Sequence, residues 1–404
     1  MASGEARQFE SRSPVIPFNP HIKAASAPPV MEARRWVEGK SFPAEKPLLN
    51  LSQAAPTDPP PEPLRQAMAE MVLGDPSVHL YGPVLGLPDL RDALAAHYSD
   101  QYQTPVGPTQ LAITAGCNEA FAAAIASLAG PGDEVLLPVP WYFNHKMWLD
   151  MAGIRAQPLA TDAALLPDLE IAATLLNEKT RALVLVSPNN PGGVEYPADY
   201  LQKAYALAHE AGIALILDET YRDFHSADGA PHRLFSDPDW DRTLISLYSF
   251  SKAYRLTGHR VGALLTSPRR LAEVEKFLDT VTICPPQLGQ KAALWGLTHL
   301  GPWLQGERRD IVARKRAMVT GLNRLRGWRC LGAGAYFAYV EHPFDIPSPD
   351  LARLLVDKAH VLALPGTMFR PEKDAAGARE LRFAFANIDA DGLETLFGRL
   401  AALG

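Results

Sequence analysis

A lysine among small hydroxyl residues is the part of this sequence best suited to chemistry. The stretch Ser249–Arg260 reads Ser-Phe-Ser-Lys-Ala-Tyr-Arg-Leu-Thr-Gly-His-Arg and follows a short apolar run. Lys252 offers a nucleophilic amine, and Ser249, Ser251 and Arg260 offer hydroxyl and guanidinium donors that suit an anion. An isolated loop lysine is usually only solvated. The gathering of these groups in one stretch favours a reactive amine beside an anionic ligand.

Two further polar stretches also come directly after apolar runs. Asp218 and Tyr221 follow Ile213–Leu217, and Asn190 lies in the stretch Ser187–Gly193. The Asp218 carboxylate could bind a metal, cap a helix or neutralise a ligand cation, and this stretch alone leaves the three open. The Asn-Pro and Gly-Gly pairs around Asn190 predict at least a turn.

A fourth stretch, Gly116, Cys117 and Asn118, places a glycine turn before an alanine-rich helix. The free N–H groups and the positive dipole end at such a helix start attract anions. In an open α/β sheet, ligands bind at the carboxyl ends of the strands. We therefore expect Lys252 and Asp218 to lie at that edge of a sheet.

The elements that must position these residues alternate in type from about residue 85. Short apolar runs without alternation indicate strands buried on both faces, and helical patterns separate most of them. The expected strands are 135–138, 182–187, 213–217, 244–248 and 261–265, and the expected helices include 87–98, 118–128 and 200–211. We predict an α/β fold whose sheet is mixed, mostly parallel and flanked by helices.

The pattern changes near residue 300, where a long charged helix is expected at 308–326, followed by shorter strands and helices. This indicates a small α+β domain after a large domain. The predicted division is a flexible N-terminal arm at 1–30, the small domain at 31–65 and 301–404, and the large domain at 66–300.

Composition excludes several classes of protein. The chain has 404 residues and a formal net charge of −6, and no basic run points to nucleic acid. It shows no apolar run long enough for a transmembrane helix and no secretory signal, so we expect no membrane association. Three widely spaced cysteines argue against a disulfide framework or a metal site and fit the cytoplasm.

The four motifs, in this order, resemble those of the fold-type I aminotransferases that use pyridoxal phosphate, in the class I/II family. The resemblance covers roughly residues 48–400, and its most specific part is Lys252 with Arg260 eight residues later. It implies a homodimer with a large α/β domain and a small domain built from both chain ends. The pattern change near residue 300 agrees with that division.

The resemblance implies a role for each matching residue. Lys252 matches the lysine that forms a Schiff base with the cofactor, and Asp218 matches the aspartate that keeps the pyridine nitrogen protonated. With Tyr221 these are the implied catalytic residues. The other implied cofactor contacts are Asn190 and Tyr221 at the ring 3-oxygen, Tyr142 stacked on the ring, Ser249, Ser251, Arg260, Gly116, Cys117 and Asn118 at the phosphate, and Tyr81 at the phosphate of the neighbouring subunit.

The implied substrates are an L-amino acid and a 2-oxo acid. Arg382 matches the arginine that binds the α-carboxylate, and Asn190 lies near it. Ala54 stands close to where the family often has a glycine whose backbone touches that carboxylate, a departure that leaves this contact open. A second carboxylate on the substrate would need a second arginine, whereas the aromatic residues Trp36, Trp141, Tyr142, Phe143 and Trp148 favour an apolar side chain.

Other functions remain open at this point. The same motifs would serve a pyridoxal-phosphate-dependent carbon–sulfur β-lyase, decarboxylase or synthase, because they hold the cofactor and the carboxylate without selecting the bond that breaks. A cofactor-binding regulator without enzymatic activity is disfavoured, since no helix-turn-helix pattern or basic face precedes the large domain.

Overall fold

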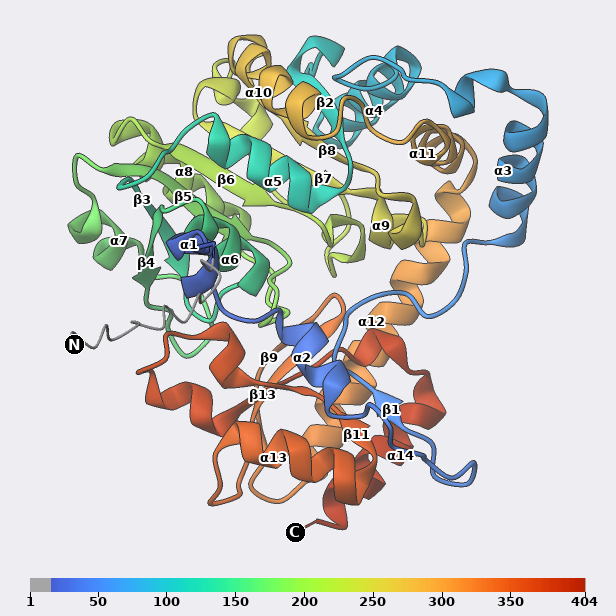
Figure 1. Cartoon of the computed structure of the whole chain (residues 1–404), viewed down its shortest axis with the longest axis vertical. Coiled ribbons are helices and arrows are strands. Elements are labelled where there is room, and N and C mark those ends of the chain that lie inside the picture. Colours follow the sequence, from blue (N-terminus) through green and yellow to red (C-terminus); the bar gives the residue numbers. More distant parts are fainter. Residues whose placement is uncertain (1–15, 404) are drawn as a thin grey trace, which may run out of the picture.

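The apolar runs of the sequence form a seven-stranded sheet in the computed structural model, which describes residues 16–403 (Figure 1). The order across the sheet is β2-β8-β7-β6-β5-β3-β4. Strands β3 to β7 run parallel, and β8 is antiparallel to both of its neighbours. The predicted mixed, mostly parallel sheet is confirmed. The strands are β2 (Leu111–Thr114), β3 (Glu134–Pro138), β4 (Arg155–Leu159), β5 (Thr180–Val186), β6 (Ala214–Asp218), β7 (Leu244–Ser249) and β8 (Gly262–Leu265).

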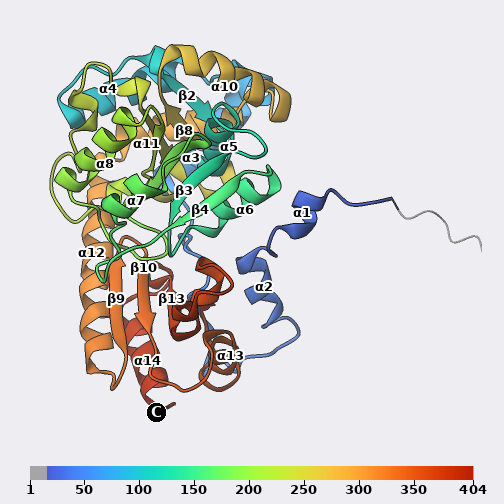
Figure 2. The same cartoon turned by 90° about the vertical axis from the view of Figure 1, so that its left-hand side faces the viewer.

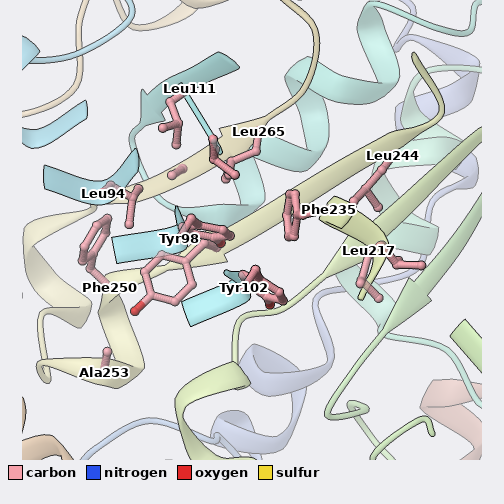
Figure 3. Close-up of a cluster of buried hydrophobic side chains, with 14 of the residues drawn as sticks. Leu94, Tyr98, Tyr102, Leu111, Leu217, Phe235, Leu244, Phe250, Ala253 and Leu265 are labelled. Carbon is pink, nitrogen blue, oxygen red and sulfur yellow. The ribbon is translucent and has the colours of Figure 1, made fainter. Parts of the chain in front are cut away.

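Helices cover both faces of this sheet. On one face lie α4 (Pro88–Tyr102), α8 (Ala198–Glu210) and α11 (Gln287–His299), and on the other lie α5 (Cys117–Ala126), α6 (Phe143–Met151) and α10 (Pro268–Val281). Successive strand residues point to opposite faces. In β6, Leu215 and Leu217 therefore enter the first core, while Ala214 and Ile216 enter the second. Figure 3 shows part of the first core, where the ring of Tyr98 of α4 packs edge-on against that of Phe235, with centroids 5.5 Å apart.

A second, four-stranded sheet lies below the first in Figure 1. It is antiparallel, in the order β12-β13-β10-β9, and helix α12 (Gly301–Arg324) leads into it. Its strands are β9 (Arg329–Gly334), β10 (Phe337–Glu341), β12 (Leu364–Pro365) and β13 (Glu380–Phe383), and its helices are α13 (Ser348–Leu354), which continues as a wider turn to Ala359, and α14 (Ala390–Ala401).

The N-terminal segment joins this lower part. Strand β1 (Leu49–Asn50) pairs in parallel with β11 (Val361–Leu362), so residues from both chain ends form one α+β unit, as predicted. Helix α2 (Pro29–Arg35) lies where the upper and lower parts meet (Figures 1 and 2). The remaining helices are α1 (Pro20–Ala24), α3 (Glu62–Gly74), α7 (Leu169–Leu175) and the single turn α9 (Phe250–Ala253).

The N-terminal arm predicted at 1–30 is described only in part. Residues 1–15 of the predicted arm lie outside the described residues, and the part that is described forms α1, which lies against α6. The domain limits at 30, 65 and 300 remain our proposal. None of the helices in residues 16–403 is both long and apolar enough to cross a membrane.

The sequence did not predict β2, β4 or β9, nor the two-residue strands β1, β11 and β12. Strand β4 reads Arg-Ala-Gln-Pro-Leu and lies at the edge of the large sheet, where a strand needs no continuous apolar run. Proline at position 158 is tolerated there because an edge strand has one unpaired side.

We expect Leu217→Ala to lower the free energy of unfolding by about 3 kcal/mol, since it leaves a cavity in a fully buried core beside Asp218. Urea denaturation followed by circular dichroism would measure this change. Ile171→Ala, at a position on α7 that is 40% exposed, is the control and should cost much less. Equal losses in the two variants would contradict this account of the core.

Candidate active site

Four loops meet at one edge of the large sheet because four strands end there. Strands β5, β6 and β7 are parallel, and β2 runs in the same direction since β8 is antiparallel to both β7 and β2. Val186 pairs with Asp218, and Asp218 pairs with Leu247, so β5, β6 and β7 end close to the same line across the sheet. The motifs that follow these strands therefore open into one space.

That space is a cavity of about 540 Å³ lined by residues of both units. Most of the predicted site residues line it, namely Ala54, Cys117, Asn118, Tyr142, Asn190, Asp218, Tyr221, Ser249, Ser251, Lys252, Arg260 and Arg382. Gly116 lies against the guanidinium of Arg260. Tyr81 does not line this cavity and is 80% exposed.

Lys252 lies on α9, the single helical turn that follows β7. Its Nζ donates a hydrogen bond of 2.8 Å to the carbonyl oxygen of Ala54. Burial, and then the positive charges of Arg260 and Arg382, lower the pKa of Lys252 to about 8. A larger share of this amine is therefore neutral and nucleophilic near neutral pH than for an exposed lysine.

Asp218 ends β6 and points to the face that carries α5 and α6. One oxygen lies 3.2 Å from Nε2 of His145, and the other accepts hydrogen bonds from the backbone N–H and hydroxyl of Thr220 at 3.0 and 2.7 Å. Burial by itself would raise the pKa of Asp218, but His145 and then Thr220 outweigh it and hold the pKa below its usual value. Asp218 is thus a buried carboxylate that can face a ligand cation.

His145 contacts Asp218 and is a site residue that the sequence analysis does not single out. Its ring stacks on Phe121 at 3.8 Å between centroids, and its Nδ1 is buried without a hydrogen-bond partner among residues 16–403. Cys117 also contacts Asp218, with Sγ 3.5 Å from Oδ1. Burial and the nearby Asp218 raise the pKa of the Cys117 thiol, so it stays protonated.

The helix start at Gly116 forms a cradle for an anion. Gly116 has φ +92°, and a Cβ there would collide with the guanidinium of Arg260. The N–H groups of Cys117 and Asn118 at the start of α5 make no hydrogen bond within the described chain. Within residues 16–403, Arg260 bonds only to carbonyl oxygens, of Thr257 at 3.1 Å and Ala115 at 3.3 Å. Helix dipole, free N–H groups and guanidinium together suit a phosphate.

Arg382 forms a second anion site on the other side of the cavity. It is 2% exposed, donates to Asn190 Oδ1 at 3.0 Å and to the Ser52 carbonyl, and keeps a buried Nε without a partner in residues 16–403. The rings of Phe337 and Phe369 each lie 5.0 Å from its guanidinium carbon. Burial lowers its pKa to about 10. A buried arginine without a carboxylate partner is expensive unless an anion binds it.

Two tyrosines close the cavity between these anion sites. Tyr142 accepts a hydrogen bond of 2.8 Å from Nδ2 of Asn144 and donates one of 3.4 Å to Asn118 Oδ1. The buried Tyr221 contacts Phe337, with ring centroids 5.1 Å apart. Burial raises the pKa of both phenols, which remain hydrogen-bond donors near neutral pH. Trp141, the residue before Tyr142, is buried and does not line the cavity.

The cavity thus holds one reactive amine, one buried carboxylate and two anion sites. This donor set fits pyridoxal phosphate: Arg260 and the Gly116 turn suit its phosphate, Asp218 its pyridinium and Lys252 its aldehyde. No cluster of metal-ligating side chains occurs in the described part of the chain.

Comparison with known proteins gives consistent results. A family model described as aminotransferase class I and II matches residues 46–400. The chain is 29% identical over 349 residues to transaminase BacF of Bacillus subtilis, covering 85% of this chain and 86% of that one. It is 30% identical over 362 residues to a valine–pyruvate aminotransferase of Mycobacterium tuberculosis, covering 86% and 89%. The structure of an aspartate aminotransferase from Thermus thermophilus with maleate has a TM-score of 0.87 at 23% identity, covering 96% of this chain and all of that one.

The reactivity of Lys252 should depend on pH with a midpoint of about 8. The apo-protein would be treated with a small aldehyde, the imine reduced with borohydride, and the labelled peptide quantified by mass spectrometry. Labelling rises with pH because only the neutral amine reacts, and Lys203, exposed on α8, is the internal reference. In Arg382→Met the midpoint should move upward, since a neighbouring positive charge is lost. An unchanged midpoint in that variant would contradict the charge coupling.

Proposed function

This chain belongs to the family of class I and II aminotransferases, and we propose that it uses the cavity at the end of its large sheet for pyridoxal-phosphate-dependent amino transfer. Family membership establishes the activity, the cofactor and the fold. The roles of individual residues, given next, are our assignment. The observation that carries it is one buried amine of lowered pKa that shares a cavity with Asp218, Arg260 and Arg382.

Each end of the cofactor has matching groups in the cavity. Arg260, Ser249, Ser251 and the turn through Gly116, Cys117 and Asn118 would hold the phosphate. Asp218, kept ionised by His145 and Thr220, would pair with the ring nitrogen. Asn190 and Tyr221 would bind the ring 3-oxygen, and Tyr142 would pack on the ring. When bound, pyridoxal phosphate supplies an electron sink that weakens the bonds to the substrate α-carbon.

The chain's own groups do the positioning and the proton transfer. Arg382, with Asn190 and the backbone near Ala54, holds the α-carboxylate of the amino acid and so fixes the orientation of its α-carbon. Lys252 removes the proton from that carbon as general base. A pKa of about 8 leaves part of this amine neutral at working pH, and the same group, once protonated, returns the proton.

The two half-reactions of amino transfer test this proposal. Holoenzyme given an amino acid alone should release the matching 2-oxo acid once and stop, and a 2-oxo acid should then regenerate the starting form. Lys252→Ala should lose both half-reactions and the covalent attachment of the cofactor. Mass spectrometry of products and protein would measure these outcomes. Pyruvate and ammonia from a cysteine conjugate would indicate the β-lyase, and carbon dioxide the decarboxylase.

We also propose that the active form is a homodimer in which Tyr81 reaches the neighbouring subunit's phosphate site. Tyr81 is 80% exposed and Leu80 65% exposed, beyond the end of α3, where Leu73 is 89% exposed. Exposed apolar residues close together are typical of an interface. Cytoplasmic location is a further proposal, supported by three free cysteines at separate places.

A mixed dimer would test the role of Tyr81. Tyr81→Ala alone should weaken cofactor binding about tenfold, because one hydrogen bond to a charged phosphate is lost. Mixing it with Lys252→Ala chains should restore wild-type cofactor affinity at one site of the hybrid, which has both its own Lys252 and an intact Tyr81 from the other chain, so activity at limiting cofactor should rise. If Tyr81 acts within its own subunit, the hybrid site that keeps Lys252 has the same weakened cofactor affinity as Tyr81→Ala, and activity at limiting cofactor does not rise.

A further inference from the structure

A third arginine lines the cavity and has no part in the roles assigned above. Arg34 lies on α2, in the segment that the sequence assigned to the small domain, and it faces the same space as Arg260 and Arg382. We infer that Arg34 binds the second carboxylate of a dicarboxylic amino acid or 2-oxo acid, so that the enzyme selects acidic substrates. This inference rests on the proposed function and adds the substrate class to it.

The contacts of Arg34 leave it available for an anion. Its Nη2 donates a hydrogen bond of 2.6 Å to Oε1 of Gln53, a neutral amide, and its Nη1 lies 3.9 Å from the sulfur of Met31. Among the described residues no carboxylate lies within ion-pair distance of it. A guanidinium carries five N–H donors, so most of its capacity is unused by the chain itself.

The position of Arg34 relative to Arg382 suits two ends of one small molecule. Arg382 donates to the carbonyl oxygen of Ser52, and Arg34 donates to the side chain of the next residue, Gln53. Consecutive Cα atoms are about 3.8 Å apart. One short segment therefore contacts both guanidiniums, and both line the same cavity. We expect a substrate whose α-carboxylate is bound by Arg382 to direct its side chain towards Arg34.

Helix α2 also presents Arg34 on a fixed surface rather than a loose loop. Val30 and Arg34 both line the cavity, as residues four apart on one helix face do. Ala33, about 100° further round the helix, is fully buried in a cluster that includes Leu362 and Leu364 of the small unit. This packing fixes the backbone position from which the Arg34 side chain extends, which favours a specific contact with a ligand.

The aromatic alternative has less support from the cavity. Trp36, Trp141 and Trp148, which favoured an apolar substrate side chain, do not line it. Phe143 does, but its ring lies 5.9 Å from the guanidinium carbon of Arg382 and so belongs to the surroundings of the α-carboxylate site. Of the two α2 residues that line the cavity, Val30 is apolar and Arg34 supplies the group that can bind a carboxylate.

Binding of inert carboxylates to the holoenzyme tests this inference without catalysis. Glutarate and pentanoate have the same chain length and differ in the second carboxylate. Calorimetric titration should show that the wild type binds glutarate at least about tenfold more tightly than pentanoate. Arg34→Met should remove this preference by weakening the binding of glutarate while leaving the binding of pentanoate unchanged. Arg34→Lys should keep part of it. Arg35→Met, at the next position and outside the cavity lining, is the matched control and should keep all of it.

The outcomes separate this inference from the proposed function. If Arg34→Met keeps the glutarate preference, or the wild type has none, the role of Arg34 is wrong even when alanine still undergoes its half-reaction. If no amino acid undergoes a half-reaction but the preference depends on Arg34, the dicarboxylate subsite stands and the proposed function fails. Equal weakening of glutarate and pentanoate in Arg34→Met would show a structural role only and would overturn the inference.

Discussion

Unbalanced positive charge in one cavity is the constraint on which the rest of this site depends. Arg34, Lys252, Arg260 and Arg382 line it, and among the described lining residues only Asp218 carries the opposite charge. Burial and mutual repulsion lower the pKa of Lys252, and burial lowers that of Arg382. The folded chain therefore carries an electrostatic cost that anionic ligands relieve, and the same cost makes its lysine reactive.

Because side chains alternate between the two faces of β6, the neighbouring carboxylates at its end have different roles. Asp218 and Glu219 are neighbours, yet they point to opposite faces. Asp218 faces the cavity, whereas Glu219 accepts hydrogen bonds from Ser246 at 2.8 Å and Tyr102 at 3.2 Å and lies 3.1 Å from His232. Burial would raise the pKa of Glu219, but His232 and Arg222 hold it low. The Glu219 carboxylate thus has its hydrogen-bond partners within the protein. These bonds hold in place the strand end that carries Asp218.

Sequence predicted most of the fold and site because short-range signals carry them. Apolar runs with polar residues at their ends located β5, β6 and β7 and the side chains that follow them, and parallel strands bring such ends together. Strand β4 lacked the apolar signal, since it is an edge strand with Arg155 and Gln157. Arg34 carried no signal at all, because its place in the cavity results from packing of α2 on residues more than 300 positions away, such as Leu362. Nothing in the sequence distinguishes His145 from the other histidines, and only the structure places it beside Asp218.

The hydrogen bond between Arg382 and Asn190 joins the two units, since β13 carries the arginine and the loop after β5 carries the asparagine. The next part of that loop is close-packed as well, because a Cβ on Gly193 would lie 2.5 Å from the backbone nitrogen of Gly334 and 2.6 Å from the carbonyl oxygen of Phe337. A carboxylate held at this seam contacts both units, so its binding free energy adds to their cohesion by mass action. The melting temperature of the folded chain should therefore rise with the concentration of a ligand bound at this seam.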